Sequence, residues 1–187
     1  MLTAAIGQFM MFRRKAYEQV GGHGAFRDHT ADDLALVRLM VAKGLVWRLV
    51  DGSQRVRCRM YQDARQVLEG FSKNLFPGFD YRIIPFVFVW LWVGLVFCEP
   101  PAILLLRAMV PSWSGPSPWL AAAAIAVSLP LWGITYWRFG FPLYLALLYP
   151  LTMVLTVAIA MRSMAVTLSG RATWKGRRLG VPGVRWL

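Results

Sequence analysis

The sequence predicts an α/β polar head followed by an α-helical transmembrane region, and three observations support this fold class. The chain is 57% hydrophobic over 187 residues, which is too apolar for one soluble domain of this length. Its charges are concentrated at the start, with 13 Lys and Arg and 8 Asp and Glu before residue 83, but only three charged residues between 83 and 161. Within the charged part, strand-like and helix-like patterns alternate along the chain.

These patterns divide the chain into a polar head (1–82), a membrane region (83–168) and a basic tail (169–187). The formal net charge is +12, and much of the surplus flanks apolar spans, where Lys and Arg meet anionic headgroups. We therefore expect a membrane as partner and no nucleic acid. The two cysteines, Cys58 and Cys98, have no metal-ligand spacing and form no disulfide framework.

The head begins with a predicted strand-helix pair. Residues 6–12 read as a buried strand and residues 14–20 as a short helix, which Gly21-Gly22 ends because glycine tolerates the left-handed conformation. No secretory cleavage site follows the early apolar run, which ends in three basic residues. A pair of this kind requires neighbouring strands that this chain does not supply upstream.

A second helix is predicted from a capping Thr30 to Gly44, and it places Asp32 and Asp33 in its first turn. Two explanations of the acidic pair are open: chemistry in a site, or the ordinary preference of acids for a helix N-terminus. His23 and His29 flank this region. They have no zinc-ligand spacing, and each is either a site residue or a surface polar group.

Two further strands, 45–50 and 55–60, are predicted around the turn signal Asp51-Gly52. The alternation of Arg55, Arg57 and Arg59 gives one basic edge, which either meets phosphate or is a solvated edge protected by charge. Asp63 is then expected to cap an amphipathic helix that ends at Pro77-Gly78. Its apolar stripe suits the membrane interface, packing against the head, or both.

Taken together, these residues resemble the C-terminal part of a membrane-bound family 2 glycosyltransferase of GT-A fold, similar to bacterial enzymes that glycosylate carotenoids or other lipids. The resemblance covers most of the chain. It rests on six motifs in this order: Gly7-Gln-Phe-Met-Met-Phe-Arg-Arg-Lys-Ala-Tyr, Val20-Gly-Gly-His, Asp32-Asp-Leu-Ala-Leu, Arg59-Met-Tyr, Gly70-Phe-Ser-Lys-Asn and Thr173-Trp-Lys-Gly-Arg-Arg.

The resemblance implies inverting transfer of a sugar from a nucleotide sugar to a lipid acceptor, at a bacterial inner membrane with the head in the cytoplasm. In that family the second acid of a Glu-Asp pair is the general base that deprotonates the acceptor, and this position matches Asp33. Asp32 replaces the usual glutamate. The family places the loop that holds His23 near the acceptor side.

Two departures from the family pattern concern the donor. Where relatives have Gln-x-x-Arg-Trp under the diphosphate, Gly70 and Phe71 stand in place of Arg and Trp, so Lys73 and Arg59 become the candidate phosphate ligands. The family also implies Mg²⁺ or Mn²⁺ on an Asp-x-Asp motif, which does not occur in this sequence. The chain is therefore expected to be a fragment, or to be completed by another polypeptide.

The membrane region contains about three predicted spans, one of them a candidate re-entrant segment. They cover 83–110, with a kink at Pro100-Pro101, then 119–137 and 141–161. Three crossings would separate tail from head, yet the basic tail favours the same cytoplasmic side as the head. The alternative to an enzyme is a truncated, non-catalytic membrane protein that serves as an anchor or partner subunit.

Overall fold

The computed structural model describes residues 5–26, 32–52, 55–110, 112, 114–174, 177–178 and 183–187. They form two compact units. The polar unit contains residues 1–82 and 163–185, and the apolar unit contains residues 83–162 together with Trp186 and Leu187. The tail therefore belongs to the same unit as the head.

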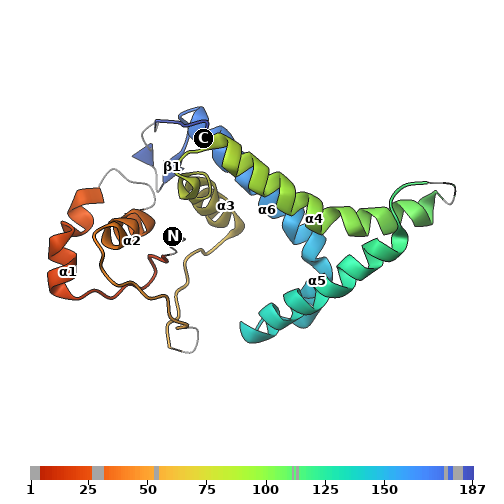
Figure 1. The fold of residues 1–187 in the computed structure, drawn as a ribbon, viewed down its shortest axis with the longest axis horizontal. Helices are drawn as coiled ribbons and strands as arrows, with labels where there is room; N and C mark the ends of the chain where they lie inside the picture. The colour runs from red at the N-terminus through yellow and green to blue at the C-terminus, as the bar shows by residue number, and fades with distance from the viewer. Residues whose placement is uncertain are drawn as a thin grey trace. The chain divides into compact units, whose positions relative to one another are not determined.

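The described residues of the head form three α-helices, in the places where local sequence signals predict them (Figure 1). They are α1 (Arg14–Gln19), α2 (Asp32–Ala42) and α3 (Ala64–Asn74), with short 3-10 turns η1 (Gly22–Phe26) and η2 (Pro77–Phe79). Gly21 ends the first helix with a φ of 80°, as the Gly-Gly signal predicts. Thr30 and His29 lie outside the described residues, so the predicted cap of α2 stays a prediction.

The core of the head lies between α1, η1 and α2. Its buried members are Val20, Leu36 and Met40, and partly buried aromatic and aliphatic side chains pack around them. Leu36 and Met40 are four residues apart on one face of α2, so helical periodicity directs both into the same core. This packing fixes the helix whose first turn holds Asp32 and Asp33.

The predicted α/β domain of GT-A type is wrong for the structure described here. Residues 6–12, 45–50 and 55–60, which the sequence favours as strands, form no strand in the described part. The strands found are β1 (Thr173–Trp174) and β2 (Arg177–Arg178), a two-residue antiparallel pair in the tail.

The physical reason is that a strand needs a partner backbone, whereas a helix satisfies its hydrogen bonds internally. In the three segments, backbone N–H groups donate to local or side-chain acceptors: Leu45 donates to Met40 O, Val56 to Gly52 O and Gly7 to Asp33. Phe12 and Leu45 still pack against the core, but several apolar side chains of these segments stay exposed, as the 88% exposed Val46 illustrates.

Helix α3 begins as predicted at Asp63, whose carboxylate accepts the Gln66 N–H at 2.8 Å. On its buried face Gly70 lies against the ring of Tyr61, and a Cβ at Gly70 would come within 2.2 Å of Tyr61 Oη. A side chain at position 70 would therefore require the Tyr61 ring to move.

The tail packs against the head inside the polar unit. Strand β1 lies beside α3 (Figure 1), and Ala172 just before it is buried. The Phe76 N–H donates to Ser163 Oγ at 3.0 Å, and both residues are fully buried. Near the C-terminus, the Arg185 N–H donates to Tyr81 O at 3.1 Å.

The apolar unit consists of α4 (Ile83–Met109), α5 (Pro118–Arg138), the 3-10 turn η3 (Leu143–Leu148) and most of α6 (Tyr149–Leu168). Among the described residues, three helices are long and apolar enough to span a membrane: 83–109, 118–138 and 143–168. Figure 1 shows α4 changing direction partway along, and the helix contains Pro100 and Pro101, which cannot donate backbone bonds. The chain is therefore a membrane protein by the length and composition of its helices.

Candidate functional site

A cleft of about 630 Å³ opens in the head beside the first turn of α2. The segment Gly7–Met10 and Phe12 form one side of it, and Asp32 and Asp33 of α2 form another. Arg14 and Tyr17 of α1 and His23 of η1 complete the lining. Three of the five predicted site residues, Asp32, Asp33 and His23, thus lie around one cleft.

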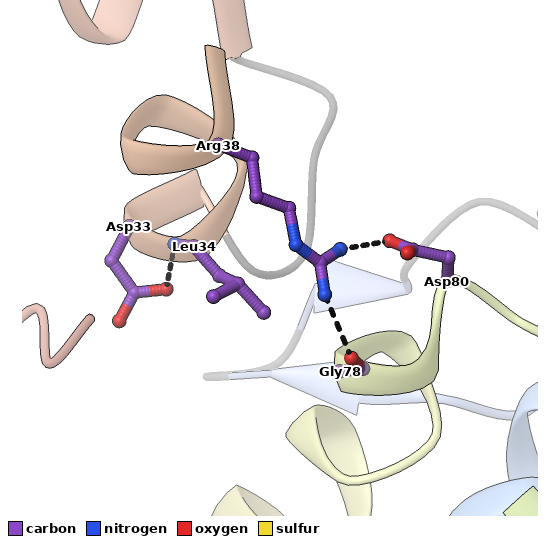
Figure 2. A network of polar contacts seen from close by, with 5 residues as sticks. All are labelled: Asp33, Leu34, Arg38, Gly78 and Asp80. Carbon is purple, nitrogen blue, oxygen red and sulfur yellow. Dashed lines mark hydrogen bonds and ion pairs between the residues drawn. The ribbon is translucent and has the colours of Figure 1, made fainter. Parts of the chain in front are cut away.

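Asp33 is held by two backbone donors. Its Oδ2 accepts the Gly7 N–H at 2.8 Å. Its Oδ1 accepts the Leu34 N–H at 2.7 Å, the bond drawn between these two residues in Figure 2. The first contact ties α2 to a segment 26 residues earlier in the chain. Each carboxylate oxygen has a second lone pair, so both retain the capacity to accept a further hydrogen bond from a ligand.

Gly7 makes this contact close. A Cβ at position 7 would lie 3.1 Å from Asp33 Oδ2, a spacing tighter than ordinary van der Waals contact. Glycine thus allows the backbone to approach the carboxylate directly. Asp32, the neighbouring acid, is exposed and lines the same cleft.

His23 is fixed through Tyr17. The His23 backbone N–H donates to Tyr17 Oη at 3.0 Å, and the same hydroxyl forms a hydrogen bond with His23 Nδ1, 2.7 Å away. The tautomer of the imidazole decides which of the two groups donates in this second bond. Phe12 packs edge-on to the imidazole, with centroids 6.3 Å apart. These contacts hold the imidazole of His23 at the lining of the cleft.

Gly22 permits this arrangement. Its φ is 56°, and an added Cβ would lie 2.5 Å from the Tyr17 ring. Both the backbone conformation and the lack of a side chain are therefore needed for Tyr17 to approach the His23 backbone.

Arg59 and Lys73, the two cations predicted from the sequence, do not line this cleft. Arg59 is exposed in the extended segment before α3, and Lys73 lies in the last turn of α3. The cation that does line the cleft is Arg14, whose guanidinium pairs with Glu18 at 2.8 Å. Sequence reasoning missed Arg14 and Tyr17, although both lie in the basic-aromatic helix just before Gly21-Gly22.

The described part of the chain contains no evident binding site for the expected divalent metal. No group of three or more His, Cys, Asp or Glu side chains there lies close enough together to hold a metal ion. The two carboxylates of the cleft, Asp32 and Asp33, are adjacent in the sequence and do not have the Asp-x-Asp spacing that the resembled family implies.

Comparison with known families places the cleft inside a recognised segment. Residues 2–64 match the model of glycosyl transferase family 21, and this stretch includes every residue that lines the cleft. The match covers about a third of the chain, and it supports a glycosyltransferase. No curated protein and no solved structure matches the chain. Membership of family 2 stays a prediction.

Proposed function

We propose that this chain is the acceptor-activating, membrane-anchoring part of a glycosyltransferase that moves a sugar from a nucleotide sugar to a lipid acceptor with inversion. The observation that carries the proposal is Asp33, which is positioned by two backbone N–H groups in a cleft within the segment that matches glycosyl transferase family 21. A sugar donor and an acceptor follow from that match. The match does not specify that the acceptor is a lipid or that the transfer inverts the anomeric carbon, and both are parts of the proposal.

In the proposed reaction the acceptor oxygen attacks the anomeric carbon from the side opposite the diphosphate. The new C–O bond forms as the bond to the diphosphate breaks, and the leaving diphosphate takes the electron pair. The acceptor proton passes to the Asp33 carboxylate, which acts as general base. Such a base must lie within hydrogen-bond reach of the attacking oxygen, so a carboxylate with a fixed orientation and free lone pairs suits the role.

The other cleft residues receive positioning roles. His23 forms a hydrogen bond with a substrate hydroxyl, and Asp32 accepts one from a sugar or acceptor hydroxyl. Arg14 supplies positive charge for the diphosphate. Arg59 and Lys73 stay proposed phosphate ligands that would act from outside the described cleft.

Mg²⁺ or Mn²⁺ stays an expected partner of the donor diphosphate, whose charge it would neutralise. Its ligands are expected outside the described residues of this chain, which form no such group. The proposal places the enzyme in a bacterial inner membrane with the head in the cytoplasm. The 13 basic residues of the head and the five of the tail support that orientation.

A non-catalytic anchor or partner subunit is the second candidate. It is favoured by the exposed apolar side chains of the extended segment between α2 and α3, where Val46 is 88% and Val50 78% exposed. Surface of this kind on a polar domain typically contacts another polypeptide.

A transfer assay separates the two candidates. Membranes containing the chain are incubated with radiolabelled nucleotide sugars, and label in extracted lipid is counted. We expect the Asp33→Asn variant to lose about 100-fold or more of the transfer rate, which is the usual contribution of a general base. Asp63→Asn is the matched control, because asparagine also caps helices well and Asp63 lies outside the cleft.

Wild-type transfer retained by Asp33→Asn would exclude Asp33 as the base. Lipid labelling above that of membranes that lack the chain, with any nucleotide sugar tested, would exclude the non-catalytic candidate.

A further inference from the structure

We propose that the chain crosses the membrane twice, and that residues 99–138 form a helical hairpin embedded in the leaflet opposite the head. The first observation concerns the ends of the membrane region. Helix α4 begins at Ile83, directly after the polar unit, and α6 re-enters that unit at Ser163. Because the path leaves and returns to one compact polar unit, the number of crossings must be even.

The return to the polar unit is secured by buried contacts. Ser163 Oγ accepts the Phe76 N–H, and both residues have no exposed surface. Farther along, residue 185 forms a bridge with Arg82, the last residue before α4. A tail on the opposite side of a bilayer could make neither contact.

Helix α6 runs antiparallel to the first half of α4. Cys98 lies against Pro150, with 3.7 Å between Sγ and the Pro150 O, and a Cβ at Gly94 would lie 3.3 Å from Val157. Position 98 of α4 thus lies beside position 150 of α6, and position 94 lies beside position 157, so the two helices run in opposite directions. The stretch from Ile83 to Cys98 is about 24 Å long at 1.5 Å per residue, so it covers most of a hydrocarbon core about 30 Å thick. These two helices are the crossings.

Helix α5 returns only to the middle of α4. Near its C-terminal end, Trp132 contacts Phe97 edge-on, with ring centroids 6.3 Å apart, and it stacks on Tyr149 at 6.2 Å. Residue 132 therefore lies at the level where α4 bends and where α6 begins. Because α4 changes direction partway along, where it contains Pro100 and Pro101, its second half and α5 form a hairpin that turns aside at that level, in the part of the distal leaflet that the first half of α4 has not yet crossed. Helix α5 continues six residues past Trp132, to Arg138.

The hairpin surface identifies its surroundings. Large apolar side chains along it are exposed within the chain, including Met109 at 78%, Trp119 at 83% and Trp137 at 73%. In the apolar window of α5, only 6% of the residues are buried. A surface this apolar is too costly to leave in water, at about 25 cal/mol per Å², so we assign it to the acyl chains of the distal leaflet.

Cysteine labelling from the two membrane faces tests the arrangement. In a Cys98→Ala background, Cys58 is exposed in the head and reports the head side. In a Cys98→Ala, Cys58→Ser background, single cysteines are placed by Ser117→Cys, Phe139→Cys and Ser169→Cys. All three positions are exposed, at the start of α5, after α5 and after α6. A membrane-impermeant maleimide is applied to sealed inside-out and right-side-out vesicles.

We expect Cys58 and Ser169→Cys to react from one face, and Ser117→Cys and Phe139→Cys from the other. If the chain crossed three times, Cys58 and Ser117→Cys would react from the same faces as with two crossings, so these two positions serve as orientation controls. Phe139→Cys and Ser169→Cys would each react from the other face. Reaction of Phe139→Cys from the head side, or of Ser169→Cys from the opposite side, would overturn the proposal. The readout needs no transferase activity, so it is independent of the proposed function.

Discussion

Arg38 of α2 forms an ion pair with Asp80, 42 residues later in the connector that precedes α4 (Figure 2). Its second terminal nitrogen donates to Gly78 O at 3.3 Å. Asp80 has a φ of 54°, in the left-handed region that Asp and Asn tolerate better than most residues. One guanidinium thus joins the helix that holds Asp33 to the end of the polar unit.

A double-mutant cycle with Arg38→Ala and Asp80→Asn should give a coupling energy of about 0.5 kcal/mol, because both side chains are partly exposed to solvent. Asparagine keeps the tolerance for positive φ, so the cycle isolates the charge. The measurement is the unfolding midpoint in detergent. Arg14 and Glu18, paired on α1 and more exposed, serve as the control cycle. Equal coupling energies in the two cycles would show that the ion pair between Arg38 and Asp80 stabilises the head no more than an exposed pair within one helix.

Gly7→Ala should slow sugar transfer roughly tenfold while leaving the unfolding midpoint nearly unchanged. The added Cβ would lie 3.1 Å from Asp33 Oδ2, so the carboxylate must move by a few tenths of an ångström. Small displacements of a reacting group have large rate effects. The rate is measured by lipid labelling from a radiolabelled nucleotide sugar.

Gly24→Ala provides the control for this prediction, because nothing lies within 4 Å of a Cβ built at position 24. It should transfer at the wild-type rate. If Gly7→Ala also does so, the contact between Gly7 and Asp33 has no bearing on the reaction.

Gly70→Ala should destabilise the head by about 1–3 kcal/mol, the usual cost of forcing extra atoms into packed space. The new Cβ would lie 2.2 Å from Tyr61 Oη, although alanine is otherwise the better helix former. Truncating the ring relieves the clash, so Gly70→Ala combined with Tyr61→Ala should be no less stable than Tyr61→Ala alone. Unfolding midpoints measure both effects.

Gly133→Ala in α5 is the matched helical control, since a Cβ there meets nothing within 4 Å. Its unfolding midpoint should be unchanged or higher. Additive losses in the Gly70 and Tyr61 double variant would contradict the close approach of the two residues.

The local part of the fold could be predicted from the sequence. The Asp63 cap, the end of α1 at Gly21 and the start of α2 at Asp32 follow from residues within one or two turns. The three apolar helices follow from uninterrupted hydropathy. The predicted strands were wrong because a strand depends on a distant partner, which an alternating pattern does not identify.

The candidate site could be predicted only in part for a related reason. Asp32 and Asp33 stand out as an acidic pair at a helix start, but the donor that orients Asp33 comes from Gly7, whose own sequence context carries no such signal. Tyr17 likewise acquires its role only when the positive φ of Gly22 directs the backbone of His23 towards its hydroxyl. Contacts between distant segments depend on packing, which local periodicity does not encode.

Tyr61 should make stability fall at high pH. Burial raises the pKa of its phenol above the usual value of 10.0, because the charged phenolate is poorly solvated beside α3. The folded state therefore keeps the proton to higher pH than the unfolded state. The stabilisation that this difference provides is complete below pH 10 and is lost as pH rises through the folded pKa. Between pH 8 and 11, the unfolding midpoint of the wild type should fall more steeply than that of Tyr61→Phe, which has no ionisable group at this position. Parallel curves for the two proteins would show that the ring is as well solvated in the folded as in the unfolded state.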